Sequence, residues 1–276
     1  MNASNVNFTD IIRRASKTFY IASLFFPKAV RRDVHILYSF LRISDDLVDA
    51  VPPRANEFRQ LKEELEKSLA GENSSYVFIS AFSDLVRRKE IGREIIFDYL
   101  SIQEMDLKKR RYESYIELDK FIYGVAGVVG LMMAKVMDLK EESFPGAIKL
   151  ASAMQNVNII RDIAEDLLAG KVYLPQDELR RFNLPDKLSA DVARRQPEAY
   201  EKFIKFQLER AQNLLMESRE SFIFIPKRIL LPIKIVADVY DDVIKRITSR
   251  PYSVFERKMR PKPWTIIRIS LKNYFL

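Results

Sequence analysis

The sequence predicts an all-α protein, and three observations support this class. Apolar residues make up 47% of the 276 residues and recur at helical spacing over long stretches, including residues 58–69, 116–137 and 203–215. Alternating strand patterns are nearly absent. Seven glycines and twelve prolines leave no Gly-rich hinge and no long Pro- or Ser-rich linker. We therefore expect one helical domain over residues 1–276.

Prolines and glycines separate the predicted helices from one another. Between these breaks the chain has room for roughly eight to eleven helices. The breaks fall at Pro52 and Pro53, residues 71–75, Pro145 and Gly146, residues 170–175, Pro185, Pro197, Pro226 and Pro251.

Two acidic clusters lie far apart in the chain but share one spacing. Asp45 and Asp49 are four residues apart, as are Asp162 and Asp166. On a helix this spacing puts both carboxylates on one face, about 6 Å apart. Because like charges at this spacing repel, the repeated pair favours a compensating cation. Mg²⁺ (or Mn²⁺) suits carboxylate oxygens and completes its shell with water and phosphate, so a diphosphate substrate is predicted.

Polar residues extend each acidic cluster along its helix. Tyr38 and Arg42 precede Asp45, and Gln155 and Asn158 precede Asp162, all at helical steps of three or four. Such polar stripes are costly to bury unless they meet ligands, ions or water. We expect the two stripes to form opposite walls of one cavity. The alternative is that the acids lie on solvated helix faces; their repetition inside apolar helices favours a functional site.

Other features exclude several classes of site. The chain has no cysteine, which excludes disulfides, thiolate catalysis and zinc-thiolate sites and suits a cytoplasmic protein. The single histidine, His35, cannot build a His-rich metal site and is interpreted as a packing residue. Arg13 and Arg14 are not followed by an apolar signal region, and no apolar run reaches the ~18 residues of a spanning helix. We predict a protein that is not integral to a membrane.

The net charge of +8 lies entirely in a basic tail that begins at about residue 243. This tail has nine Lys or Arg residues and one acid, Glu256, and it also carries apolar residues at 264, 266, 267, 269, 271 and 274–276. A basic and apolar mixture suits peripheral binding to an anionic membrane, here the inner face. The alternative is that the tail packs on the body. We find no zinc finger, RNP-like aromatic set or bZIP heptad, so no nucleic-acid partner is predicted.

Four motifs, in this order, resemble the squalene and phytoene synthase family. The resemblance runs from about residue 8 to about residue 265 and implies a helical isoprenoid synthase fold with a central cavity. The motifs are Ser16-Lys17-Thr18-Phe19-Tyr20, residues 37–49, Val125-Ala126-Gly127-Val128-Val129-Gly130, and residues 155–166 followed by Gly170-Lys171-Val172-Tyr173-Leu174-Pro175.

The resemblance also implies a reaction and roles for residues. Two prenyl diphosphates condense head to head through a cyclopropylcarbinyl diphosphate, which then rearranges to a linear terpene. Asp45, Asp49, Asp162 and Asp166, with Asn158, are the expected metal ligands, and Arg42 and Arg161 the expected diphosphate contacts. Expected substrate contacts are Ser16, Thr18, Phe19, Tyr38, Phe121, Val125, Ala126, Gly130, Gln155 and Tyr173, with Arg257 as the candidate from the tail.

The favoured product is phytoene from two geranylgeranyl diphosphates, because the small residues Ala22 and Ser23 leave room for a C20 chain. Squalene or hydroxysqualene formation from farnesyl diphosphate is the alternative. Squalene needs NADPH, for which the chain has no dinucleotide fingerprint. One departure from the family is Phe121, where a tyrosine is common.

Two other functions are alternatives for this sequence. A chain-elongating prenyltransferase or terpene cyclase would share the aspartates, and a non-catalytic basic helical protein would bind membranes or nucleic acid. A third acidic pair, Asp238 and Asp242, lacks a polar stripe and is interpreted as structural.

Overall fold

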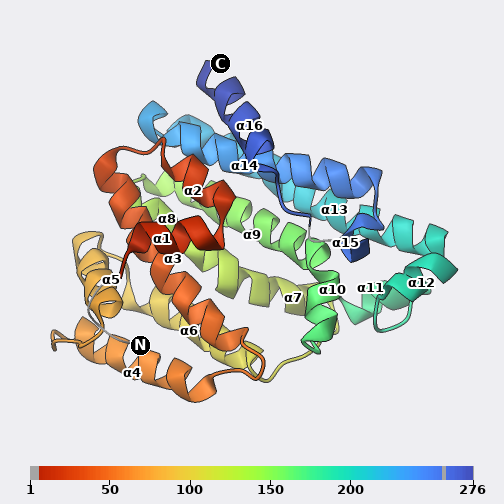
Figure 1. Cartoon of the computed structure of the whole chain (residues 1–276), viewed down its shortest axis with the longest axis horizontal. Helices are drawn as coiled ribbons and strands as arrows, with labels where there is room; N and C mark the ends of the chain where they lie inside the picture. Colours follow the sequence, from red (N-terminus) through yellow and green to blue (C-terminus); the bar gives the residue numbers. More distant parts are fainter. Residues whose placement is uncertain (1–5, 257–258, 276) are drawn as a thin grey trace.

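The computed structural model describes residues 6–256 and 259–275 and is all-helical, as predicted (Figure 1). These residues form sixteen α-helices, one π-helical turn and two 3₁₀ turns. They contain no strand, only an isolated bridge between Arg111 and Val172. The predicted eight to eleven helices are too few because serines also end helices. Ser16, for example, separates α1 from α2 and accepts a hydrogen bond from the Phe19 amide at 3.3 Å.

The helices follow one another with short connections. In the first half they are α1 (Phe8–Ala15), α2 (Lys17–Ser23), α3 (Lys28–Val48), α4 (Ala55–Leu69), α5 (Val77–Arg88), α6 (Arg93–Asp106), α7 (Tyr115–Ile122), η1 (Tyr123–Gly127) and α8 (Val128–Val136). In the second half they are η2 (Glu141–Ser143), α9 (Phe144–Arg161), α10 (Ile163–Leu168), α11 (Gln176–Arg181), α12 (Ala190–Arg195), α13 (Pro197–Glu220), η3 (Ser221–Phe224), α14 (Lys227–Ser249), α15 (Ser253–Glu256) and α16 (Pro263–Phe275).

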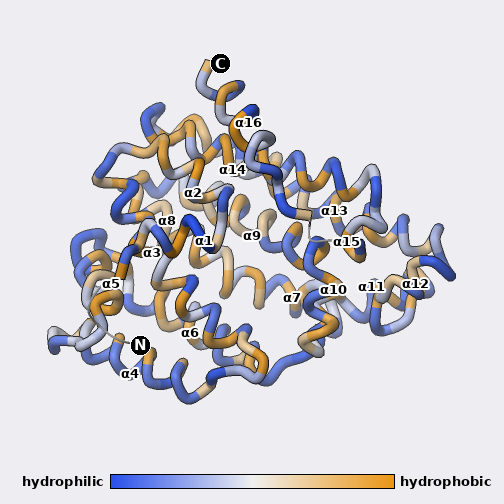
Figure 2. The backbone as a smooth tube through the Cα atoms, in the orientation of Figure 1, coloured by the Kyte–Doolittle hydropathy of each residue, from blue (hydrophilic) through white to orange (hydrophobic). Residues whose placement is uncertain are grey.

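Helix α9 crosses the middle of the molecule and packs most extensively against α13, with α8 on another side (Figure 1). One apolar core surrounds α7, α9, α13 and α14 and includes Tyr200 and Phe203. A second core surrounds α3, α5, α6 and α8, where Phe40 and Phe82 stack with ring centroids 3.9 Å apart. A small third cluster joins α2, α14 and α16. Figure 2 shows α4, at the periphery, as largely hydrophilic.

Glycine permits the close approach of α8 to α9. A Cβ atom added at Gly130 would lie 2.4 Å from the carbonyl oxygen of Ala147. Any side chain at this position would therefore push the two helices apart. The helix expected over residues 116–137 is interrupted by the π-helical turn η1, which shifts the helix face by about one residue.

The basic tail begins in the last turns of α14 and also includes α15 and helix α16. One face of α16 packs on α2 and α14. Among the described residues, none of the helices combines the length and apolar content needed to cross a bilayer.

Candidate active site

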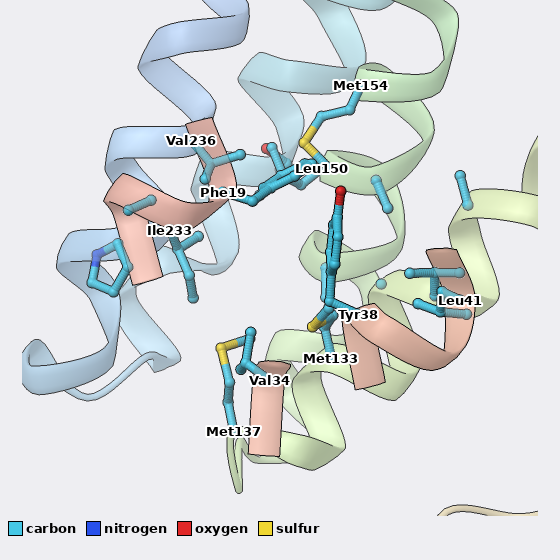
Figure 3. A pocket seen from close by; sticks show the side chains of 18 of the residues that line it. Phe19, Val34, Tyr38, Leu41, Met133, Met137, Leu150, Met154, Ile233 and Val236 are labelled. Atoms are coloured by element: carbon cyan, nitrogen blue, oxygen red, sulfur yellow. The ribbon is translucent and has the colours of Figure 1, made fainter. Parts of the chain in front are cut away.

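A cavity of about 320 Å³ lies between α2, α3, α8, α9 and α14. Figure 3 shows the Tyr38 hydroxyl close to Phe19 and Met154, with Val34 and Met137 towards the opposite end. Residues of both large apolar cores line the cavity, for example Tyr240 of the first core and Val34 of the second. The predicted site residues that line it are Phe19, Tyr38, Arg42, Asp45, Val125, Ala126, Gly130, Gln155 and Asn158.

The lining changes from apolar to polar along its two longest helices. On α3 the lining residues run from Val34 to Asp45, and on α9 from Gly146 to Asn158. At 1.5 Å per residue these runs rise about 16 Å and about 18 Å. In both helices the polar residues come last, so carboxylates and amides gather where the helices end. Backbone carbonyls make the end of a helix negative, which disfavours carboxylates there unless a cation is near.

Asp45, in the last turns of α3, is held by side chains of α6. The Tyr99 hydroxyl donates a hydrogen bond to the Asp45 carboxylate at 2.7 Å, and the Gln103 amide donates to the same oxygen. Ser44 hydrogen-bonds Tyr99 at 2.9 Å. Burial, with repulsion from Asp49 and despite the hydrogen bond from Tyr99, raises the pKa of Asp45 to about 7.

The rest of the first cluster is more exposed. Arg42 pairs with Asp46 at 2.5 Å while its side chain lines the cavity. Asp49 ends α3, where its amide donates to the Asp45 carbonyl at 2.8 Å. The Asp49 side chain is 66% exposed, so this carboxylate is accessible to a ligand.

The second cluster lies at a break in the helix. The predicted run over Asp162 and Asp166 is not one helix, because α9 ends at Arg161 and α10 begins at Ile163. The Asp166 amide still donates to the Asp162 carbonyl at 2.9 Å, which keeps the two acids one turn apart. Arg161 donates two hydrogen bonds to Asp162, at 2.9 and 2.6 Å.

Burial, followed by repulsion from Asp162, raises the pKa of Asp166 to about 7. Repulsion from Asp49 contributes to the same rise, and the Lys171 cation opposes it. The fold therefore brings the second cluster within electrostatic range of the first, as the two predicted stripes required.

Lys171 connects the two clusters, a role that sequence reasoning missed. Its ammonium lies 2.5 Å from an Asp106 oxygen and 3.3 Å from an Asp49 oxygen. Tyr173 donates its hydroxyl to Asp106 at 2.8 Å. Burial alone would lower the pKa of Lys171, but the carboxylates of Asp106 and Asp49 outweigh it and raise the pKa above its ordinary value. Lys171 is thus a fixed ammonium cation in an acidic site.

Tyr240 of α14 is a second residue that sequence reasoning missed. Its hydroxyl donates to the Asn158 side-chain oxygen at 3.2 Å, and its ring lines the cavity. The Asn158 amide donates to Gln155 at 3.4 Å. Tyr240 lies in an apolar stretch beside the Asp238 and Asp242 pair, so it carries no motif of its own. Its helical phase alone gave no reason to distinguish it from a core residue.

Several predicted substrate contacts lie outside the cavity lining. Phe121 is buried between Tyr112 and Tyr173, with ring centroids 5.2 and 5.3 Å away, so it belongs to an aromatic stack in the core. Ser16 caps α2, and Thr18 is buried in that helix. Arg257 falls outside the described residues. The remaining predicted residues beyond the lining, namely Asp49, Arg161, Asp162, Asp166 and Tyr173, belong to the charged network next to it.

The acidic site has the donors that Mg²⁺ prefers, although a complete coordination sphere is not formed. Within residues 6–256 and 259–275, no three acidic or histidine side chains converge closely enough to hold a metal ion. Asp49 and Asp162 are instead engaged by Lys171 and Arg161. The proposed ligands Asp45, Asp49, Asn158, Asp162 and Asp166 offer carboxylate or amide oxygens, and Asp45 and Asp166 both have raised pKa values. This donor set fits Mg²⁺ or Mn²⁺.

The third acidic pair has partners elsewhere. Asp238 pairs with Arg219 at 2.6 Å and accepts from Asn273 at 2.8 Å, and Asp242 pairs with Arg246 at 3.0 Å. Neither aspartate lines the cavity. The predicted structural role of this pair agrees with these contacts. His35 is likewise a buried packing residue, hydrogen-bonded to Ser23 at 2.8 Å.

Known proteins are similar to this chain over nearly its whole length. The 15-cis-phytoene synthase of Synechococcus elongatus is 29% identical over 271 residues, covering 92% of this chain and 87% of the relative. Phytoene synthase 3 of Zea mays, a chloroplastic protein, is 32% identical over 262 residues; the match covers 90% of this chain and 60% of the maize protein.

Solved structures share the fold. A dehydrosqualene synthase in complex with ligand superposes with a TM-score of 0.85 at 27% identity, covering 97% of this chain and 94% of that chain. A squalene synthase from Alicyclobacillus acidocaldarius, at 23% identity, has a TM-score of 0.76 and covers 89% and 94%.

The helical fold, its cavity and these similarities define a prenyltransferase-type enzyme of the isoprenoid synthase fold. The chain belongs to the squalene/phytoene synthase family, whose model matches residues 12–265.

The acidic clusters can be tested by single substitutions. We expect Asp49→Asn and Asp162→Asn each to lower turnover by about 100-fold or more, because each removes a charge from the proposed metal site. Thermal unfolding of the metal-free Asp49→Asn protein should change little, since one like-charge repulsion is also removed. Asp162→Asn also removes the charged partner of Arg161, so this variant should unfold at a somewhat lower temperature. Asp238→Asn is the control and should retain turnover. Loss of less than about tenfold in either test variant would contradict the assignment.

Proposed function

We propose that this enzyme condenses two geranylgeranyl diphosphates head to head, through a cyclopropylcarbinyl diphosphate, to give phytoene. The observation that carries the proposal is the cavity itself, which is largely apolar and has the Asp45 carboxylate of α3 and the Gln155 and Asn158 amides of α9 at one end, next to the other acids. A prenyl chain fits the apolar part and a diphosphate the polar part. The similarity to proteins named phytoene synthase, such as that of Arthrospira platensis, supports the same substrate class.

The residues at the polar end have two proposed roles in the ionisation of the substrate: metal binding and diphosphate binding. Asp45 and Asp49 from α3, with Asn158, Asp162 and Asp166, would hold Mg²⁺, which when bound stabilises the negative charge that develops on departing diphosphate. Arg42 and Arg161 are the proposed diphosphate contacts, because a guanidinium makes paired hydrogen bonds to phosphate oxygens.

The apolar walls exclude water from the allylic cation that remains. Phe19 and Tyr38 present ring faces with centroids 5.7 Å apart, and a ring face favours a nearby cation. Val125 and Gly130 add an apolar surface at which a chain can lie close to the helix backbone. Because Phe121 lies outside the lining, the missing tyrosine hydroxyl leaves this wall unchanged.

The small residues of α2 in the cavity lining favour a C20 chain. Ala22 and Ser23 both line it, and their small side chains leave space beside α2. We propose that the second rearrangement ends by proton loss, so no NADPH is needed. The alternative is a C30 product from farnesyl diphosphate, which is supported by the similarity to a dehydrosqualene synthase structure.

Product analysis tests this proposal. The enzyme is incubated with C15 or C20 prenyl diphosphate and Mg²⁺, with and without NADPH, and the products are identified by mass spectrometry. We expect phytoene from the C20 substrate, with diphosphate release that requires Mg²⁺ and is unaffected by NADPH. A C30 product formed in preference to phytoene would support the alternative. No diphosphate release from either substrate would contradict an enzymatic role.

We also propose that α16 attaches the enzyme peripherally to an anionic membrane, which would receive the apolar product. Ile266 and Ile269 pack on α2 and α14, whereas Trp264 is 60%, Ile267 46% and Leu271 53% exposed. One face of α16 is thus packed on the body of the protein, and the other leaves apolar side chains exposed. Among the described residues, no ion pair involves the exposed bases Lys262, Arg268 and Lys272. Exposed apolar and basic groups together suit the interface of an anionic bilayer.

Vesicle co-sedimentation tests the role of α16. The triple variant Trp264→Ser, Ile267→Ser, Leu271→Ser should lose most binding to anionic vesicles, because its apolar contacts are removed. Ile116→Ser, which changes an exposed isoleucine on α7, is the matched control. Wild-type binding should fall as salt rises, since each base near the surface contributes about 1 kcal/mol that salt screens. Equal binding to anionic and neutral vesicles would contradict the proposal.

A further inference from the structure

Lys171 is a buried charged residue that the proposed reaction does not use. It is only 5% exposed and lies between a buried acid, Asp106 at 3% exposure, and the exposed acid Asp49. A buried ammonium is costly unless it is paired, so this arrangement requires both its position and its partners to be well defined.

The backbone fixes the position of Lys171 next to the second acidic cluster. Gly170, with a φ of +75°, turns the chain sharply after α10. The Lys171 amide then donates to the Asp166 carbonyl at 2.8 Å, and the next amide, of Val172, donates to the Arg110 carbonyl at 2.8 Å. The side chain of Lys171 therefore extends from the backbone of the second cluster to a carboxylate of the first.

The two carboxylate partners of Lys171 are not equivalent. The contact with Asp106 is short, at 2.5 Å, buried, and supported by the Tyr173 hydroxyl, which also binds Asp106. The contact with Asp49 is longer, at 3.3 Å, and the Asp49 side chain is 66% exposed. Asp106 is thus the permanent partner, whereas Asp49 can exchange Lys171 for another cation.

We infer that Lys171 is an internal counter-ion of the acidic site, held in place by Asp106, which binds Asp49 until a divalent metal takes that carboxylate. The inference rests on the proposed function, because it assumes that Asp49 is a metal ligand. Lys171 acts through Asp49 and is therefore a positioning residue. It competes with the metal, and so it sets the metal concentration at which the first cluster fills.

Two variants should shift metal binding in opposite directions. Asp106→Asn removes the permanent partner and leaves the Lys171 ammonium to pair with Asp49 alone, so metal should bind more weakly. The double variant Lys171→Met, Asp106→Asn removes the competitor and leaves no buried charge unpaired, so metal should bind more tightly. Lys171→Met alone would leave Asp106 buried without its cation and is expected to be less stable, which makes the double variant the better test.

The experiment measures Mn²⁺ binding to the full-length protein without substrate, from the electron paramagnetic resonance signal of free Mn²⁺. Thermal unfolding checks the fold of each variant. We expect the dissociation constant to rise about fivefold for Asp106→Asn and to fall about fivefold for the double variant, in line with the loss or gain of one nearby charge interaction. The matched control is Glu178→Gln, Arg210→Met, which removes another ion pair of 2.5 Å, between largely buried side chains; it should not change Mn²⁺ affinity.

A purely structural Lys171–Asp106 pair would lower thermal stability without opposite shifts in affinity. The inference is therefore overturned if both test variants bind Mn²⁺ within about twofold of the wild type, or if both shift in the same direction. That result would leave the proposed function intact, provided that the wild type binds Mn²⁺ and releases diphosphate. Absence of Mn²⁺ binding by the wild-type protein would overturn the inference and the proposed metal site together.

Discussion

Repulsion between carboxylates at the ends of α3 and α9 is the constraint on which the rest of the site depends. Asp45 and Asp166 are sufficiently desolvated, and sufficiently close to other acids, that both pKa values rise to about 7. At the first cluster the C-terminal end of α3 adds negative charge of its own. The protein balances this with cations of its own, through Arg161 on Asp162 and Lys171 on Asp49. We propose that a divalent metal ion can displace these side-chain cations and bind the carboxylate oxygens.

The same two helices supply the apolar part of the cavity. Because the lining of α3 and α9 changes from apolar to polar along about 16 to 18 Å, one pair of helices contributes both to the part of the cavity proposed for a prenyl chain and to the part proposed for its diphosphate. Gly130 brings α8 close enough to α9 to close one wall. The side chains that hold Asp45 come from α6, so the position of the first cluster depends on packing far along the chain.

The sequence contained enough information to predict the helical class and many of the polar residues of the cavity lining, because both follow from local spacing. Asp45 and Asn158 each lie at helical steps from other polar residues, and Phe19 lies in the motif over residues 16–20. Lys171 lies in the motif over residues 170–175, but its role was missed because its partners Asp106 and Asp49 are distant in sequence. Tyr240 was missed because no local pattern distinguishes it from a core aromatic. Phe121 shows the opposite case: its motif suggested the cavity, but stacking on Tyr112 and Tyr173 places it in the core. The helix break at Asp162 could not be predicted from the spacing of the acids, because the hydrogen-bonded turn between Asp162 and Asp166 is kept despite the break.

The most direct test of this account is the effect of Mg²⁺ on thermal unfolding as a function of pH. Since the folded pKa values of Asp45 and Asp166, about 7, lie above the ordinary value of 3.8, these groups take up protons on folding. Their contribution to metal-free stability is therefore lost as the pH rises through about 7. Mg²⁺ binds the ionised carboxylates, so its stabilising effect should be larger at about pH 8 than at about pH 6. A rise in unfolding temperature that is equal at both pH values, or absent at both, would contradict the account.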